Sequence, residues 1–129
     1  MDFRGRFLEG VERFNRQRFW DAHEAWEELW LAAGSDLVRF LQGLIQLAAA
    51  YHHVQRGTLS GAARLFDAAL EKLAAFPPVY CGIDRSNAVA AAARHRDAIR
   101  SGAAFACHDY PSLVLADERD SPIPPVENW

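Results

Sequence analysis

Apolar residues recur at helical spacing in five consecutive segments of this chain, and that periodicity constrains the fold more than any other feature of the sequence. The clearest case is an aromatic and apolar stripe near the N-terminus, formed by Phe3, Phe7, Val11 and Phe14. Most of these segments stop at or just before a glycine, an asparagine or a proline pair, residues that end helices. β-branched residues are few, so local propensity also favours helices. The sequence therefore predicts an all-α fold, a bundle of about five helices.

The predicted helices cover residues 3–15, 19–33, 37–55, 58–76 and 87–100. Expected N-terminal caps are Ser35 or Asp36 for the third, Thr58 or Ser60 for the fourth, and Asp84 or Ser86 for the fifth. The first should end with Asn15 in a left-handed conformation, and the third should end at Gly57. Because apolar residues surround most of the third helix, we expect it to be the central and most buried one. The stretch from residue 80 to 83 is expected to be irregular.

The composition changes beyond residue 102, where prolines and acidic residues accumulate. We therefore expect one domain over residues 1–129, with a helical core over 3–102 and an extended Pro-rich tail over 103–129. The Leu-Val-Leu run at 113–115, or Trp129, should anchor this tail to the body or to a neighbouring subunit, which would make a homodimer.

A weak internal repeat relates the first two predicted helices to the next two at an interval of 40 residues. The superposed pairs are Phe14 with Val54, Phe19 with Leu59, Ala22 with Ala62, Trp26 with Phe66 and Trp30 with Leu70. A small residue one turn before an aromatic one is typical of tetratricopeptide units, whose period is about 34 residues. We expect two αα-hairpins forming a tetratricopeptide-like pseudo-repeat within a bundle rather than a solenoid.

Charge and cysteine content exclude several classes of protein. With 14 basic and 17 acidic residues the net charge is -3, which does not favour nucleic-acid binding. No apolar run approaches the ~20 residues that cross a bilayer, and the N-terminus lacks the apolar core of a secretory signal, so we expect a cytoplasmic protein with no membrane partner. Cys81 and Cys107 are interpreted as ordinary thiols, with a disulfide between them as the alternative.

The second predicted helix carries a histidine and a carboxylate within an aromatic stripe. At about 100° per residue its shared face comprises Phe19, His23, Trp26, Glu27 and Trp30, while Glu24 and Glu28 turn toward solvent. Burying a charged carboxylate costs several kcal/mol unless a partner receives it, so Glu27 should have one.

The third predicted helix supplies candidate partners along one polar line: Arg39, Gln42, Gln46 and His53. The small residues Gly43, Ala49 and Ala50 separate them and would let the second helix approach closely. If the two helices pack antiparallel, His23 lies toward His53, Glu27 near Gln46, and Trp30 toward Gln42. The sequence therefore predicts a polar site between the second and third helices.

The strings His23-Glu24-Ala25-Trp26-Glu27-Glu28-Leu29-Trp30 and Gln42-Gly43-Leu44-Ile45-Gln46 resemble those of domain-of-unknown-function family 309, small bacterial and archaeal proteins. The similarity covers roughly residues 5 to 75. It implies an all-helical fold and a shared polar site without an established activity. The residues that match the pattern are His23, Glu24, Trp26, Glu27, Trp30, Gly43, Gln46 and His53.

The sequence supports a binding or interaction module whose ligand pocket comprises His23, Glu24, Trp26, Glu27, Trp30, Gln42, Gln46 and His53. One alternative is a hydrolase, in which His23 and Glu27 act as acid/base residues or bind a divalent metal with His53 or His52. Another is a structural or oligomeric module in which a buried polar network sets helix register.

Several known motifs are absent. The string is not HExxH, since Glu27 stands where a zincin has its second histidine, and neither a phosphate-binding glycine motif nor a GxSxG elbow occurs. No Glu-x-x-His pair occurs on two helices, which excludes a ferritin-like di-iron centre. His95 and His108 are expected to be exposed or locally bonded.

Overall fold

The computed structural model describes residues 2–34, 36–102, 107 and 109–116. Its helices are α1 (Phe3–Asn15), α2 (Phe19–Ala32), α3 (Asp36–Arg56), α4 (Leu59–Leu73) and α5 (Ser86–Arg100). Three two-residue strands accompany them: β1 (Val79–Tyr80), β2 (Ile83–Asp84) and β3 (Val114–Leu115). The predicted all-α fold is confirmed.

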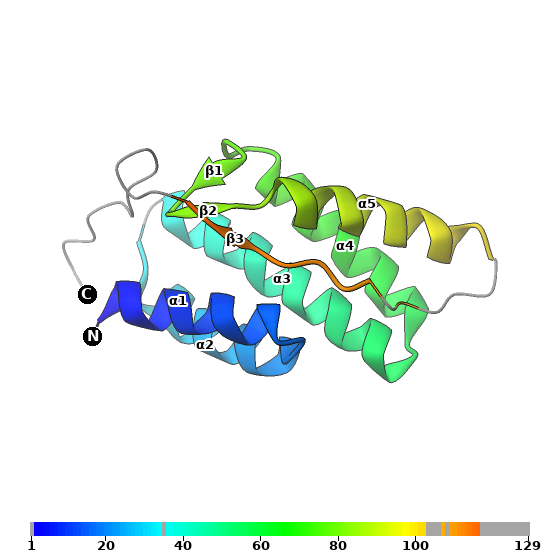
Figure 1. Ribbon diagram of the computed structural model, residues 1–129, viewed down its shortest axis with the longest axis horizontal. Helices are drawn as coiled ribbons and strands as arrows, with labels where there is room; N and C mark the ends of the chain where they lie inside the picture. The colour runs from blue at the N-terminus through cyan, green and yellow to red at the C-terminus, as the bar shows by residue number, and fades with distance from the viewer. Residues whose placement is uncertain (1, 35, 103–106, 108, 117–129) are drawn as a thin grey trace.

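Successive helices run in opposite directions and pack as neighbours (Figure 1). α1 packs on α2, α2 on α3, α3 on α4, and α4 on α5. The hairpins α1–α2 and α3–α4 are the two predicted αα-hairpins. α3 packs between α2 and α4 and so joins the two hairpins. Its side chains Phe40, Leu41, Leu44 and Leu47 are fully buried, as its apolar circumference predicted.

α1 and α2 approach closely because one contact residue is a glycine. The Trp26 side chain is fully buried, and its Nε1 donates a hydrogen bond to the Phe7 carbonyl oxygen at 3.1 Å. A Cβ placed on Gly10 would lie 2.2 Å from that Nε1, far inside contact distance. The indole ring therefore occupies the space that any larger residue at position 10 would need.

The helix ends differ in part from expectation. α1 ends at Asn15 as predicted, but the left-handed residue is Gln17, with φ of 64°, rather than Asn15. Gly57 has φ of 79° immediately after α3, which confirms its predicted role. α4 ends at Leu73, short of the predicted boundary at Phe76, and the next residues form turns.

The residues that begin the helices also differ from the predicted N-terminal caps. Arg85 occupies the N-cap position of α5 without a side-chain capping bond, whereas Asp84 and Ser86 were the expected caps. Asp84 Oδ1, one residue earlier, accepts the Ser86 backbone N–H at 2.9 Å. Thr58 occupies the N-cap position of α4 but makes no side-chain capping bond, and its hydroxyl donates to the His53 carbonyl at 3.2 Å. The side-chain caps expected at residues 35 and 36 lie outside what the structure describes.

A small antiparallel sheet replaces the irregular stretch expected after α4. β1 pairs with β2 through a two-residue turn, Cys81-Gly82, whose φ values are 54° and 76°. Two central residues with positive φ define the type I′ turn that matches the twist of a hairpin. The sequence prediction missed this turn because Asn-Gly or Asp-Gly is its usual signature, and Cys-Gly is not.

The C-terminal segment joins this sheet and the helices. β3 pairs antiparallel with β2, with Leu115 opposite Ile83. Leu113 is buried, and the Asn15 side chain bonds both its N–H, at 2.7 Å, and its carbonyl, at 2.8 Å. The run at 113–115 thus anchors the segment to the body of the same chain, which was one of the predicted anchors. The other predicted anchor, Trp129, lies outside the described residues.

A buried arginine joins the sheet to α4. Arg85 is 2% exposed, and its Nη2 donates to the carbonyls of Leu73, at 3.1 Å, and Phe76, at 3.0 Å. The guanidinium also lies over the Phe40 ring, 5.2 Å from its centroid. Burial lowers the pKa of Arg85 below its ordinary value. These bonds hold the last carbonyl of α4 and a carbonyl of the turn that follows it to the arginine of the β2–α5 junction.

Both cysteines, Cys81 and Cys107, are free thiols, so the alternative of a disulfide between them is wrong. Among the described helices, none is long and apolar enough to cross a membrane.

We expect Gly10→Ala to lower the free energy of unfolding by about 1 to 3 kcal/mol, because the new methyl group displaces the Trp26 ring. Chemical denaturation measures this. The matched control is Gly61→Ala on α4, where the added Cβ would lie an ordinary 3.6 Å from His53 Nδ1. Helix propensity should make that control neutral or stabilising by up to about 1 kcal/mol. Equal stability of the two variants would contradict the close packing of α1 on α2.

Candidate functional site

His23 and Glu27 lie one turn apart on α2, with 3.4 Å between Nε2 and Oε2. The Glu27 side chain is 46% exposed and the His23 side chain 16% exposed. The expectation that Glu27 is buried is therefore wrong. The buried face of α2 is centred on Ala22, Trp26 and Leu29, which places His23 and Glu27 at its border, where water reaches the carboxylate.

Trp20 extends this border. Its ring stacks on the His23 ring, with centroids 4.6 Å apart and planes 10° apart, and lies 5.1 Å from the His52 ring of α3. Burial lowers the pKa of His52, and positive charge on Arg56 lowers it further. His52, rather than the expected His53, is thus the α3 histidine that shares a stacking partner with His23.

His53 is oriented toward the start of α4. Its Nδ1 lies 2.6 Å from the Thr58 hydroxyl. The expected metal set of His23, Glu27 and His53 does not converge: within the described residues, the one group of three metal-binding side chains whose ligand atoms lie together is elsewhere.

Three polar atoms at or near the contact of α2 with α3 are buried without a hydrogen-bond partner in the described protein: His23 Nδ1, Trp30 Nε1 and Gln46 Oε1. Because the helices run antiparallel and Trp20 meets His52, Trp30 comes level with residue 42 of α3, one turn from Gln46. Buried polar atoms are nearly always satisfied, so three such atoms on residues of the predicted motif are unusual. They do not form the closed network that the structural alternative requires.

The remaining predicted residues are spread over several surfaces. Trp26 faces α1 and belongs to the core. Gln42 is half-buried and Arg39 is exposed. Gly43 packs against α4, since a Cβ there would lie 2.8 Å from Leu73 Cδ2. The expectation that Gly43 admits α2 is wrong, because the side of α3 that carries Gly43 faces α4, its partner in the same hairpin.

The outer face of α2 is shallowly hollowed. The depression is lined by Trp20, His23, Glu24, Glu27, Glu28 and Leu31. Trp20 is 46% and Leu31 72% exposed, while Glu24 is exposed as predicted. Glu28 accepts a hydrogen bond from Arg6 Nε of α1 at 3.1 Å. The surface therefore combines an exposed indole ring, an exposed leucine and several carboxylates.

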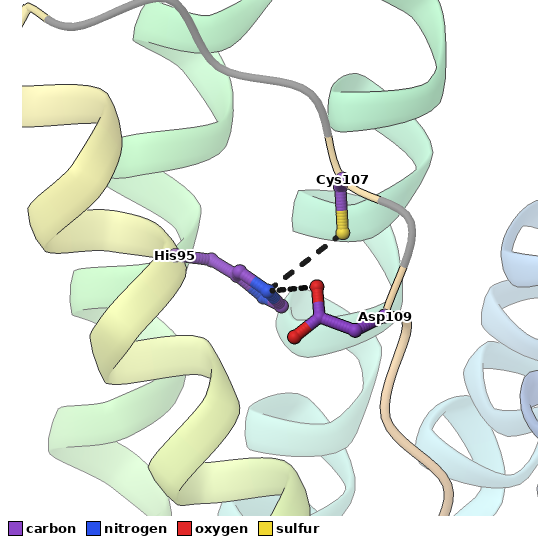
Figure 2. Close-up of side chains that lie close together, drawn as sticks. All are labelled: His95, Cys107 and Asp109. Atoms are coloured by element: carbon purple, nitrogen blue, oxygen red, sulfur yellow. Dashed lines mark hydrogen bonds and ion pairs between the residues drawn. The ribbon is translucent and has the colours of Figure 1, made fainter.

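A second cluster, formed by His95, Cys107 and Asp109, lies between α5 and the C-terminal segment (Figure 2). His95 Nε2 lies 3.2 Å from Asp109 Oδ1 and 3.7 Å from Cys107 Sγ. Its Nδ1 lies 2.8 Å from the Tyr51 hydroxyl on α3. His95 is 6% exposed and bonded to a residue 44 positions away, so the expectation of an exposed or locally bonded side chain is wrong. His108 lies outside the described residues.

The electrostatics of this cluster follow from its contacts. The hydrogen bond from His95 lowers the pKa of Asp109, while burial raises the pKa of the Cys107 thiol. Burial also raises the pKa of the Tyr51 hydroxyl. A thiol with a raised pKa is not an activated nucleophile, so the cluster does not resemble a cysteine-protease site.

Sequence reasoning did not find this cluster because its convergence is tertiary. One signal was available: Cys107 and Asp109 are two residues apart, and alternate residues of an extended segment face the same side. Nothing in the spacing indicates that this side faces His95.

Residues 7–65 match the model of a family described as Domain of unknown function (DUF309), which confirms the resemblance. No curated protein matches the chain. The matched region includes all of α2 and α3, and with them His23, Glu27 and Gln46. It contains Tyr51, the hydrogen-bond partner of His95, but none of the second cluster, since His95, Cys107 and Asp109 lie beyond it.

We expect Glu27→Gln to change the free energy of unfolding by less than about 1 kcal/mol, because the ion pair with His23 is exposed. Trp26→Phe should cost about 2 kcal/mol or more, since it removes a buried hydrogen bond and leaves a void beside Gly10. Urea denaturation of both variants measures this difference. A cost for Glu27→Gln as large as that for Trp26→Phe would restore the structural-network interpretation.

Proposed function

We propose that the DUF309 region of this chain is a binding module that takes a basic segment of a protein partner on the outer face of α2. The residues we assign to this face are Trp20, His23, Glu24 and Glu27, here called the α2 face. One observation carries the proposal: an exposed tryptophan, held by stacking on His23, stands beside the exposed Glu24 and the half-exposed Glu27 carboxylate in a single depression.

The chemistry of the α2 face favours a cation. A guanidinium or ammonium group gains from lying over an indole ring and from pairing with carboxylates at the same time. Glu27 pairs with His23 at 3.4 Å and with no arginine or lysine among the described residues. Leu31, which is 72% exposed at one end of the depression, adds an apolar contact suited to a peptide rather than to a free metal ion.

An arginine of the chain itself already illustrates the recognition. Arg6 of α1 reaches across to Glu28 at the edge of the depression and also pairs with Glu9. A partner's arginine would meet Glu24 and Glu27, which precede Glu28 within one turn of α2, in a similar way. The net charge of -3 adds a weak general attraction for basic partners.

Two unpartnered atoms also argue against a purely structural role. In a structural network His23 and Gln46 would satisfy each other or Glu27, yet His23 Nδ1 and Gln46 Oε1 have no partner among the described residues.

The test is a titration of the full chain with a fluorescein-labelled peptide of alternating arginine and leucine, followed by fluorescence anisotropy. We expect saturable binding that Trp20→Ala weakens by about fivefold or more, through loss of the cation–π contact. The double variant Glu24→Gln/Glu27→Gln should weaken binding at least as much.

The matched control is Glu12→Gln/Glu71→Gln, which makes the same change in net charge at exposed positions on α1 and α4. It should leave the affinity within about twofold of the parent chain. Equal weakening by the control would show only general charge attraction, and absence of saturable binding by the parent chain would overturn the proposal.

A further inference from the structure

Three side chains of different ligand type converge where the C-terminal segment crosses α5. His95 comes from α5, and Cys107 and Asp109 come from the segment, both side chains turned toward the imidazole (Figure 2). One ligand atom from each lies within 4.8 Å of the other two, and no other group of this kind occurs within 2–34, 36–102, 107 and 109–116.

We propose that His95 Nε2, Cys107 Sγ and an Asp109 carboxylate oxygen bind a zinc ion. The site is separate from the α2 face and uses none of its residues. It links the C-terminal segment to α5, so that metal binding and the placement of this segment depend on each other.

The separations match those of a tetrahedral zinc site. With bonds of about 2.3 Å to sulfur and about 2.1 Å to nitrogen or oxygen, tetrahedral angles put sulfur and nitrogen about 3.6 Å apart, and nitrogen and oxygen about 3.4 Å apart. The structure has 3.7 Å between Cys107 Sγ and His95 Nε2, and 3.2 Å between His95 Nε2 and Asp109 Oδ1. Two of the three separations thus agree with tetrahedral coordination, and the third, between sulfur and the carboxylate oxygen, is within 4.8 Å.

The ligand types favour zinc over other common ions. A thiolate disfavours magnesium and calcium, which prefer oxygen, while a set of sulfur, nitrogen and oxygen suits zinc. Three protein ligands leave a fourth position for water. Asp109 is 72% exposed, so the site opens toward solvent on the carboxylate side. On binding, the Cys107 thiol gives its proton to solvent and coordinates as the thiolate.

Tyr51 acts as a positioning residue. Histidine ligands usually donate their second ring N–H to a neighbouring acceptor, which fixes the orientation of the ring. The Tyr51 hydroxyl, 2.8 Å from His95 Nδ1, is such an acceptor and leaves Nε2 directed at Cys107 and Asp109. The Tyr51 ring is itself fully buried, so this acceptor is held in place by the core.

The experiment uses the full chain, stripped of metal and titrated with Zn²⁺ against a chromophoric chelator. We expect one ion per chain and a melting temperature that rises with Zn²⁺. Cys107→Ser and Asp109→Asn should each weaken zinc binding by about 100-fold or more. Co²⁺ in place of Zn²⁺ should show the near-ultraviolet thiolate charge-transfer band, absent in Cys107→Ser.

Two further variants separate a metal site from a merely hydrogen-bonded cluster. Cys81→Ala removes the other thiol and should leave zinc affinity and the cobalt band unchanged, since Cys81 lies in the β1–β2 turn. Tyr51→Phe should retain the cobalt band but weaken affinity by about 10- to 100-fold, as loss of an outer-shell partner does. Zinc binding that survives both Cys107→Ser and Asp109→Asn, or no binding by the parent chain, would overturn the proposal.

Discussion

The buried ring of Tyr51 is the contact on which the rest of the structure depends. From the middle of α3 it meets one aromatic ring from every other helix: Phe14 of α1, Phe19 of α2, Phe66 of α4 and His95 of α5. Centroid distances of 4.9 to 6.2 Å fall in the range where edge-to-face and offset pairs gain energy beyond area burial. A single side chain thus sets the relative placement of both hairpins and α5, while its hydroxyl orients His95.

The two surfaces proposed to bind are consequences of that arrangement. α2 packs on one side of the α3–α4 pair and leaves its outer face, with Trp20 and Glu27, open to a basic partner. α5 packs against α4, and the C-terminal segment returns to it, bringing Cys107 and Asp109 to His95. The first surface lies within the DUF309 match, whereas His95, Cys107 and Asp109 lie beyond it.

Much of the fold could be predicted because helices carry their own signals. Apolar spacing identified all five helices, with most boundaries within a residue or two, and Gly57 ends α3 with the positive φ that local chemistry requires. The candidate site was harder to predict. Residues 23 and 27 were singled out from their pattern, but a helical wheel gives relative angles and not the position of the packed face. The packed face of α2 differs from the predicted one by part of a turn, so Glu27 lies at its border and not in the core.

What the sequence by itself determined is local: helix positions, turn residues and the chemical types along each face, all set by interactions within a few residues. Only the tertiary structure decided which faces meet. Gly43 packs against α4 rather than α2, and Arg85 binds the last carbonyl of α4. His95 contacts a cysteine and an aspartate from a segment with no periodic signal. These contacts join residues far apart in the chain, and the best joint packing of all the helices selects them, which no short stretch of sequence encodes.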